Sequence, residues 1–300
     1  MKITEMLSPF LALKQPATER MYGGIINRLS EAHPEWWLLN ATQATQYLAD
    51  VRRRIQADGL PTAVATLRLY GAALKSIFAH LVRCGVRADN PFDAAWRAIS
   101  PRQQAQKRPT ALIPFQIVRK MLKAPDLRKA NGVRDAALLA VLFGCGLRRS
   151  EAAGLNVGDI KIIEQSPKVW ALTLKQTKAG KRVDVPMNTW VATRACQLVA
   201  QRHSAGADNA DPLFVTAYRG GSRIDGRTIA RLFQRYAQQA GLDTAAPHAA
   251  RATFATRLKA QGFDEQQIAE ALRHSGTAQV HVYVKRSESQ KNAPTKSIIF

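Results

Sequence analysis

The sequence predicts a mainly α-helical protein with one small antiparallel β-sheet, divided into two domains. Apolar residues recur at helical spacing along most of the 300 residues, whereas three short segments between residues 160 and 185 have β-branched and alternating character. Residues 100–113 have no apolar periodicity and carry prolines, several glutamines and a cluster of basic residues. A chain of this length can bury two cores, so we expect one domain on each side of that stretch.

The first domain, residues 1–99, is expected to consist of helices. Its segments have apolar residues at the period of an α-helix, and short breaks separate them. The expected helices are Ala17–Ser30, Ala41–Ala57, Thr62–Arg83 and a short one near Ala94–Ile99, after Asn90-Pro91. Residues 100–113 then form the predicted interdomain linker.

The second domain, residues 114–300, is expected to have helices before and after a small antiparallel sheet. Three strands are predicted over Ile160–Ile163, Val169–Gln176 and Arg182–Val185, with Lys178-Ala179-Gly180 as the turn between the last two. The expected helices are Pro114–Lys123, Val133–Phe143 (stopped by Gly144 and Gly146), Val191–His203, Asp225–Ala240, Ala249–Gln261, Asp264–Leu272 and a short one around Ala278–Val284.

The net charge points to a polyanionic partner. The chain carries 44 Lys and Arg against 22 Asp and Glu, a formal charge of +22, so DNA, RNA and anionic membranes are all candidates. The longest apolar stretch, Ala136–Leu147, is shorter than the ~20 residues that a spanning helix needs. The first residues, which include acidic Glu5, lack the pattern of a secretory signal. We therefore expect a cytoplasmic protein that binds nucleic acid and no membrane.

No sequence pattern indicates a cofactor or a metal. Cys84, Cys145 and Cys196 are odd in number and far apart, which favours buried reduced thiols over disulfides or a zinc site. The sequence contains no CxxC, HExxH or Walker-type motif. Without a metal, cleavage of a phosphodiester needs a nucleophile, cations around the phosphate oxygens and an acid for the leaving oxygen.

Two basic residues of the second domain stand at breaks in the pattern. Arg148, in GLRRSE, follows two glycines and can project into a cleft while Ser150 and Glu151 cap the next turn. The alternative is a surface arginine paired with Glu151. Lys178, at the expected hairpin turn, can reach a phosphate or a leaving oxygen, although lysines in turns are commonly solvated.

Four further candidates lie nearer the C-terminus. His248 and Arg251 are three residues apart, which puts both on one face of an expected helix near its start at Pro247. The alternative is a capping histidine beside a surface arginine. His274 follows a helix and could cap its C-terminal end. Tyr283, in HVYVK, has the surroundings of an ordinary amphipathic core residue.

The order of these six residues resembles the signature of the tyrosine recombinases, also called the phage-integrase family. The motifs are GLRRSE at Gly146–Glu151, KAGKRVDVP at Lys178–Pro186, HAAR at His248–Arg251, HSG at His274–Gly276, and Tyr283 nine positions after His274. The first domain is similar to the family's helical core-binding domain, including its Asn90-Pro91-Phe92 ending. The resemblance therefore covers nearly the whole chain. The sequence departs from the family pattern at Arg273, where the family usually has Gly, and at Ala250 and Ala252, which replace Leu and His.

The resemblance implies a site-specific recombinase that cleaves and rejoins duplex DNA through a 3′-phosphotyrosine. Residues 1–99 would be the core-binding (SAM-like) domain, and residues 114–300 the α+β catalytic domain with a C-terminal tail. Tyr283 would be the nucleophile. Arg148 and Arg251 would hold the non-bridging oxygens.

The remaining site residues would handle protons and hydrogen bonds. His274 would donate a further hydrogen bond to the non-bridging oxygens. Lys178 would protonate the leaving 5′ oxygen, and His248 would assist proton transfer from Tyr283, whose ordinary pKa is near 10. The covalent bond preserves the phosphodiester energy, so the resemblance implies neither ATP nor metal.

The resemblance also implies a homo-oligomer, a tetramer when two DNA sites are synapsed. Each protomer of the family donates its C-terminal segment to a neighbour. The tail after Tyr283 is polar at first and ends in apolar Ser297–Phe300, which suits that role. A frayed terminus is the alternative.

Three other functions compete with this interpretation. A type IB topoisomerase shares the chemistry but relaxes supercoils as a monomer, and the separate helical domain and the tail favour recombination instead. A DNA-binding regulator without catalysis should have lost at least one of the six residues. A metal-dependent nuclease would need a cluster of Asp and Glu that the sequence does not show.

Overall fold

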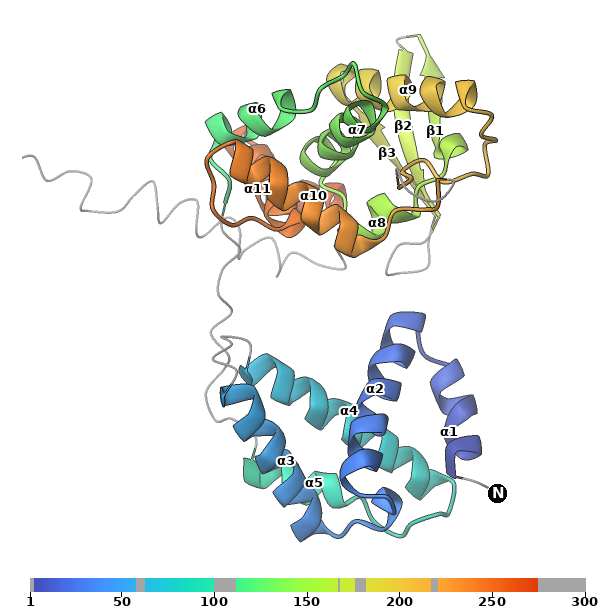
Figure 1. The fold of residues 1–300 in the computed structure, drawn as a ribbon, viewed down its shortest axis with the longest axis vertical. Helices are drawn as coiled ribbons and strands as arrows, with labels where there is room; N and C mark the ends of the chain where they lie inside the picture. The colour runs from blue at the N-terminus through green and yellow to red at the C-terminus, as the bar shows by residue number, and fades with distance from the viewer. Residues whose placement is uncertain are drawn as a thin grey trace, which may run out of the picture. The chain divides into compact units, whose positions relative to one another are not determined.

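The structure is a computed structural model that describes residues 3–57, 63–99, 112–166, 168–175, 182–216 and 221–274. The chain divides into two compact units, Met1–Lys107 and Arg108–Phe300, each with its own apolar core. As predicted, the described elements are mainly helices, with a three-stranded antiparallel sheet in the second unit (Figure 1). The boundaries expected for the domains and for the linker over 100–113 remain predictions, because residues 100–111 lie outside the described part.

The first unit packs its helices around aromatic rings. Phe78 lies near both Trp36 and Phe92, with ring centroids 5.7 and 4.8 Å apart, and all three rings are buried. Tilted ring pairs of this kind add a favourable term to the burial of apolar surface. The described elements are α1 (Ile3–Ala12), α2 (Pro16–Ala32), η1 (Trp36–Leu38), α3 (Ala41–Ala57), α4 (Ala63–Arg83) and α5 (Pro91–Ile99).

The second unit is built around helix α7 (Ala130–Gly144), in which every residue from 132 to 143 is buried. A helix that is buried all round must be covered on several sides. Helices α6, α8, α9 and α11 all contact it (Figure 1). The other described helices are α6 (Phe115–Lys123), α8 (Arg149–Gly154), η2 (Val157–Asp159), α9 (Thr189–Ser204), α10 (Gly226–Gln239), α11 (Pro247–Ala260) and α12 (Glu265–Ala271).

The sheet contains β1 (Ile160–Gln165), β2 (Lys168–Leu174) and β3 (Val183–Met187) in that order, and both pairs are antiparallel. Its central strand β2 is buried over its last four residues, and α9 packs against β1 and β2. The strands therefore lie where β-branched alternation predicts them, with ends shifted by a few residues. The predicted turn Lys178-Ala179-Gly180 lies outside the described residues.

Two α-helices of the described part, α1 and α8, are not among those expected from the sequence. Helix α1 contains Pro9, which removes a backbone donor and normally indicates a break. Helix α8 has six residues, too few to show a helical period. The helix expected around Ala278–Val284 lies outside the described part of the chain.

The burial expected for the cysteines is wrong in part. Cys145 is buried, but Cys84 is exposed and Cys196 is intermediate. Cys84 lies one residue past the end of α4, where the packed helix has ended and the chain turns at Gly85. Within the described residues, no helix is long and apolar enough to cross a membrane.

The turn after α7 has an unusual backbone conformation at Gly146. Gly146 has a φ of +57°, in the left-handed region that favours glycine. A Cβ at this position would also lie 2.6 Å from the ring of Phe254 on α11. The close approach therefore requires glycine for two separate reasons.

We predict that Gly146→Ala destabilises the protein more than Gly206→Ala does. Gly206 also has a positive φ, +80°, but a Cβ there would meet no atom within 4 Å. Both substitutions should lower the free energy of unfolding by roughly 1–2 kcal/mol through backbone strain. Gly146→Ala should lose about 1–3 kcal/mol more, because the methyl group collides with Phe254. Urea unfolding of both variants measures the difference, and equal losses would show that the contact with Phe254 is unimportant.

Candidate active site

Four of the six predicted site residues lie in the described part of the chain, and the structure brings them together. Arg148 is the residue before α8, His248 and Arg251 lie in the first half of α11, and His274 follows α12. Both histidines lie close enough to Arg148 and Arg251 for those charges to lower their pKa values. Lys178 and Tyr283 lie outside the described residues.

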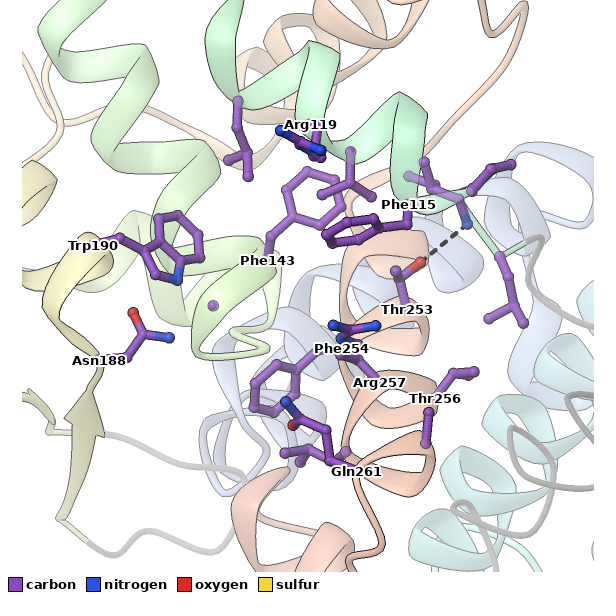
Figure 2. A pocket seen from close by; sticks show the side chains of 18 residues that line it. Phe115, Arg119, Phe143, Asn188, Trp190, Thr253, Phe254, Thr256, Arg257 and Gln261 are labelled. Atoms are coloured by element: carbon purple, nitrogen blue, oxygen red, sulfur yellow. Dashed lines mark hydrogen bonds between the residues drawn. The ribbon is translucent and has the colours of Figure 1, made fainter.

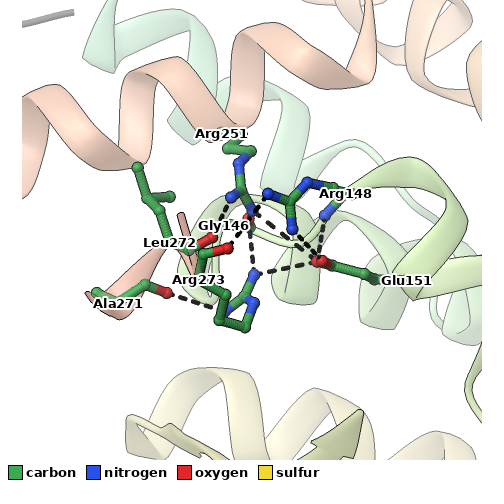
Figure 3. A network of polar contacts seen from close by, with 7 residues as sticks. All are labelled: Gly146, Arg148, Glu151, Arg251, Ala271, Leu272 and Arg273. Carbon is green, nitrogen blue, oxygen red and sulfur yellow. Dashed lines mark hydrogen bonds and ion pairs between the residues drawn. The ribbon is translucent and has the colours of Figure 1, made fainter. Parts of the chain in front are cut away.

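The centre of the cluster is the carboxylate of Glu151, whose side chain is only 4% exposed. The backbone N–H of Arg148 donates to Glu151 Oε2 at 2.7 Å, and its Nη1 donates to Oε1 at 2.6 Å (Figure 3). The first bond caps the start of α8. Arg148 therefore pairs with Glu151, as expected if it were a surface arginine. However, the Arg148 side chain is only 23% exposed and belongs to the cluster.

Glu151 is held in its charged form. Burial by itself would raise the pKa of the carboxyl group, but the guanidinium of Arg273 and the hydrogen bonds from Arg148 outweigh burial and lower it. A buried carboxylate is stable only with such partners. Its negative charge therefore fixes the arginines around it.

Arg251 is the most deeply buried member, with a side chain 1% exposed. Its Nη1 donates to the carbonyl oxygen of Gly146 at 2.6 Å, and its Nη2 donates to the carbonyl oxygen of Leu272. Nη1 also lies 3.9 Å from Glu151 Oε2 (Figure 3). The alternative interpretation of Arg251 as a surface arginine is therefore wrong.

Arg273 also belongs to the cluster, which the sequence patterns do not predict. Its Nη2 donates to Glu151 Oε2 at 3.1 Å and to the carbonyl oxygen of Gly146 at 3.2 Å, and its Nη1 donates to the carbonyl oxygen of Ala271 at 2.9 Å. The one signal in the sequence is its place directly before His274. The departure from the family's usual Gly thus adds a third guanidinium to the cluster (Figure 3).

The two histidines are neutral at pH 7. Partial burial of the ring lowers the pKa of His248, and the charges of Arg251 and Arg148 lower it further. Burial and the charges of Arg251, Arg148 and Arg273 lower the pKa of His274 to about 4. A neutral imidazole has one donor and one acceptor nitrogen, so each ring can donate one hydrogen bond and can accept either a second hydrogen bond or a proton.

The arrangement suits a phosphate. Three guanidinium groups surround one carboxylate among the described side chains, which leaves two positive charges uncompensated. Buried arginines bind carboxylates and phosphates with paired, charge-assisted hydrogen bonds. The cluster can therefore hold a phosphate group beside two neutral imidazoles.

We predict that the imidazole of His274 titrates near pH 4, well below the ordinary histidine value of about 6.5. The native protein then binds this proton more weakly than the unfolded chain does. The contribution to stability is complete above pH 6.5 and decreases as the pH falls toward 4. NMR titration of the imidazole, assigned with His274→Asn, measures the pKa. Between pH 7 and pH 5, the free energy of unfolding measured with urea should fall less for His274→Asn than for the wild type. An NMR titration midpoint of the His274 imidazole between pH 6 and 7 would contradict the prediction.

Comparison with known proteins shows the family. The profile of the phage integrase family matches residues 112–290. Tyrosine recombinase XerD of Neisseria meningitidis serogroup B is 32% identical over 245 residues, which cover 79% of this chain and 77% of the relative. Tyrosine recombinase XerA of Thermococcus kodakarensis is 28% identical over 287 residues, covering 95% and 90%.

The fold is similar to that of a recombinase solved with DNA. The crystal structure of the XerH site-specific recombinase bound to a palindromic difH substrate matches with a TM-score of 0.69 and 18% identity, covering 91% of this chain and 77% of that one. With the residue cluster above, these findings identify the chain. It belongs to the phage integrase family, and it is a tyrosine-type site-specific recombinase.

Proposed function

We propose that this chain cleaves and rejoins duplex DNA through a covalent 3′-phosphotyrosine at Tyr283. The observation that carries the proposal is the cluster of Arg148, Arg251 and Arg273 around Glu151, beside two neutral imidazoles. The Tyr283 oxygen attacks phosphorus, and the bond from phosphorus to the 5′ oxygen breaks. Rejoining reverses the step with the 5′-hydroxyl of the partner strand. Phosphodiester energy is kept in the phosphotyrosine, so the proposed reaction uses neither ATP nor a metal.

The proposed roles of the described residues follow from their charges. Arg148 and Arg251 bind the non-bridging oxygens and stabilise the charge that develops on them in the transition state. His274 donates a hydrogen bond to the same oxygens. His248 accepts the proton of Tyr283, and its lowered pKa keeps the ring unprotonated and ready to accept at neutral pH. Lys178 protonates the leaving 5′ oxygen.

The first domain, which we place at residues 1–99, supplies much of the DNA affinity in this proposal. Its helix α3 exposes a run of three arginines, Arg52–Arg54. Contacts of such side chains with phosphates are independent of sequence and weaken as salt rises. Together with the basic residues of the linker, residues 100–113, they would hold duplex DNA against the catalytic domain.

We predict that wild-type protein becomes covalently linked to a suicide substrate in EDTA and that Tyr283→Phe does not. The substrate carries the DNA site that the protein protects in footprinting, with a nick next to the scissile phosphate. The short fragment that carries the new 5′-hydroxyl then diffuses away, so the covalent link cannot be reversed and denaturing electrophoresis detects it. Lys178→Ala should still bind the site but form the link at least ~100-fold more slowly.

Two outcomes would overturn the proposal: a link formed by Tyr283→Phe, or a link that requires added metal. A second assay separates recombination from relaxation. Strand exchange between two differently labelled sites is expected of a recombinase. Relaxation of supercoils without exchange would instead indicate a type IB topoisomerase-like activity.

We also propose that protomers assemble as a tetramer on two DNA sites and exchange their C-terminal segments. The second domain contains a pocket that suits the apolar segment Ser297–Phe300. The cavity has a volume of about 740 Å³. Its lining is mostly apolar and comes from α6, α11, the end of α7 and the start of α9 (Figure 2). Phe115 and Trp190 line it and are exposed. Exposed apolar side chains beside an apolar pocket support such a contact.

We predict that Trp190→Asp and Ile299→Asp each weaken assembly on DNA carrying two binding sites by at least ~10-fold, because a buried charge opposes the apolar contact. Ile163→Asp is the matched control, since Ile163 is an exposed apolar residue of β1 that does not line the pocket. Native mass spectrometry of the DNA complexes measures assembly.

Mixing the two variants tests the exchange directly. A Trp190→Asp protomer can still donate its tail to an Ile299→Asp protomer, whose pocket is intact. Mixed complexes should therefore assemble better than either variant alone. Assembly of the Trp190→Asp variant at the wild-type level would contradict the proposed pocket.

A further inference from the structure

Arg273 has a backbone conformation that disfavours its own side chain. Among the described residues it is the one non-glycine residue with a positive φ, +56°. It follows the end of α12, where Arg273 N–H donates to Glu270 O at 2.8 Å and His274 N–H donates to Ala269 O at 2.9 Å. This pattern of bonds usually places glycine at the left-handed position. An arginine there is strained and needs a compensating interaction.

The compensation lies in the side chain, which is turned into the protein and 5% exposed. Its guanidinium contacts the carboxylate of Glu151 and the carbonyl oxygens of Gly146 and Ala271. Gly146 O also accepts from Arg251, so the two arginines share one acceptor. The side chain therefore joins the phosphate-binding cluster rather than the solvent.

The charge of the cluster depends on Arg273. Arg148 and Arg251 with Glu151 leave one uncompensated positive charge, and Arg273 raises this to two. A phosphodiester carries one negative charge in the ground state, whereas the five-coordinate transition state carries two. The third guanidinium therefore complements the transition state better than the ground state, and a difference of that kind accelerates the chemical step.

A second observation concerns hydrogen bonds that Arg273 and its neighbour His274 do not make within the described part of the chain. Its Nε and the Nδ1 of His274 are buried and have no hydrogen-bond partner among the described residues. Buried guanidinium N–H groups almost always have an acceptor. Two adjacent side chains of the cluster therefore keep unused hydrogen-bonding capacity, and the excess positive charge beside them is not compensated by the described residues.

We infer that Arg273 is a positioning residue for strand cleavage, which holds Glu151 and adds the positive charge that stabilises the transition state. This inference rests on the proposed function. Arg273 acts through the cluster and raises the cleavage rate, while DNA affinity is set elsewhere. The role is electrostatic, so another cation at this position preserves it in part.

Three substitutions separate charge from backbone conformation. Arg273→Gly removes both the strain and the charge, Arg273→Asn removes the charge with a residue that tolerates the left-handed region, and Arg273→Lys keeps the charge and the strain. Arg128→Asn is the control, because Arg128 is an exposed arginine of the same unit outside the cluster. Thermal unfolding confirms that each variant is folded.

The measured quantities are DNA affinity and the single-turnover rate of covalent linkage to the suicide substrate. Arg273→Gly and Arg273→Asn should bind DNA within about twofold of wild type and cleave at least ~10-fold more slowly. Arg273→Lys should recover a substantial part of the rate, and Arg128→Asn should cleave like wild type.

Three results would overturn the inference. In the first, Arg273→Gly cleaves DNA at least as fast as Arg273→Lys, which is expected if the backbone turn matters and the charge of the side chain does not. In the second, all variants cleave at the wild-type rate. In the third, affinity falls as much as the rate. In each case wild type still forms the Tyr283-dependent link, whereas failure of the proposed function would abolish that link in wild type itself.

Discussion

The buried carboxylate of Glu151 fixes the geometry of the active site. It accepts hydrogen bonds from the backbone and side chain of Arg148 and from Arg273, and it pairs with Arg251 at longer range. These partners come from the start of α8, from α11 and from the turn after α12. A buried charge without partners is costly, and this holds for the arginines as well as for the carboxylate. Each segment is therefore held in place by the charges of the others.

The fold brings these charges together through the turn that follows α7. This buried helix ends at Gly144, and Gly146 then takes a left-handed conformation that lets α11 approach closely. The carbonyl oxygen of Gly146 accepts hydrogen bonds from Arg251 and Arg273. The central helix of the apolar core thus sets the position of an acceptor in the polar site, and packing and electrostatics are coupled at this residue.

Much of this arrangement could be predicted from local sequence patterns. The spacing of His248 and Arg251 predicts one face of α11, and β-branched alternation predicts the three strands. The short helix α8 has too few residues to show a regular apolar period, and α1 contains Pro9, which normally indicates a break in a helix. The position of the Arg273 side chain depends on its contacts with Glu151 and Gly146, which are separated from it by 122 and 127 positions in the sequence. No local pattern encodes such contacts or the sign of φ at an arginine.

Permanent charge and proton transfer are divided between different residues of the site. Arginine stays protonated at any physiological pH, whereas burial, and then these same positive charges, lower the pKa values of His248 and His274 and keep both rings neutral. A third guanidinium therefore favours the transition state at the phosphate and weakens the basicity of the His274 imidazole. In the proposed mechanism the weaker basicity is offset, because the same positive charges lower the pKa of the hydroxyl group of a tyrosine that approaches the phosphate. A strongly cationic cluster then needs only a weak base, and His248 in its neutral form supplies one.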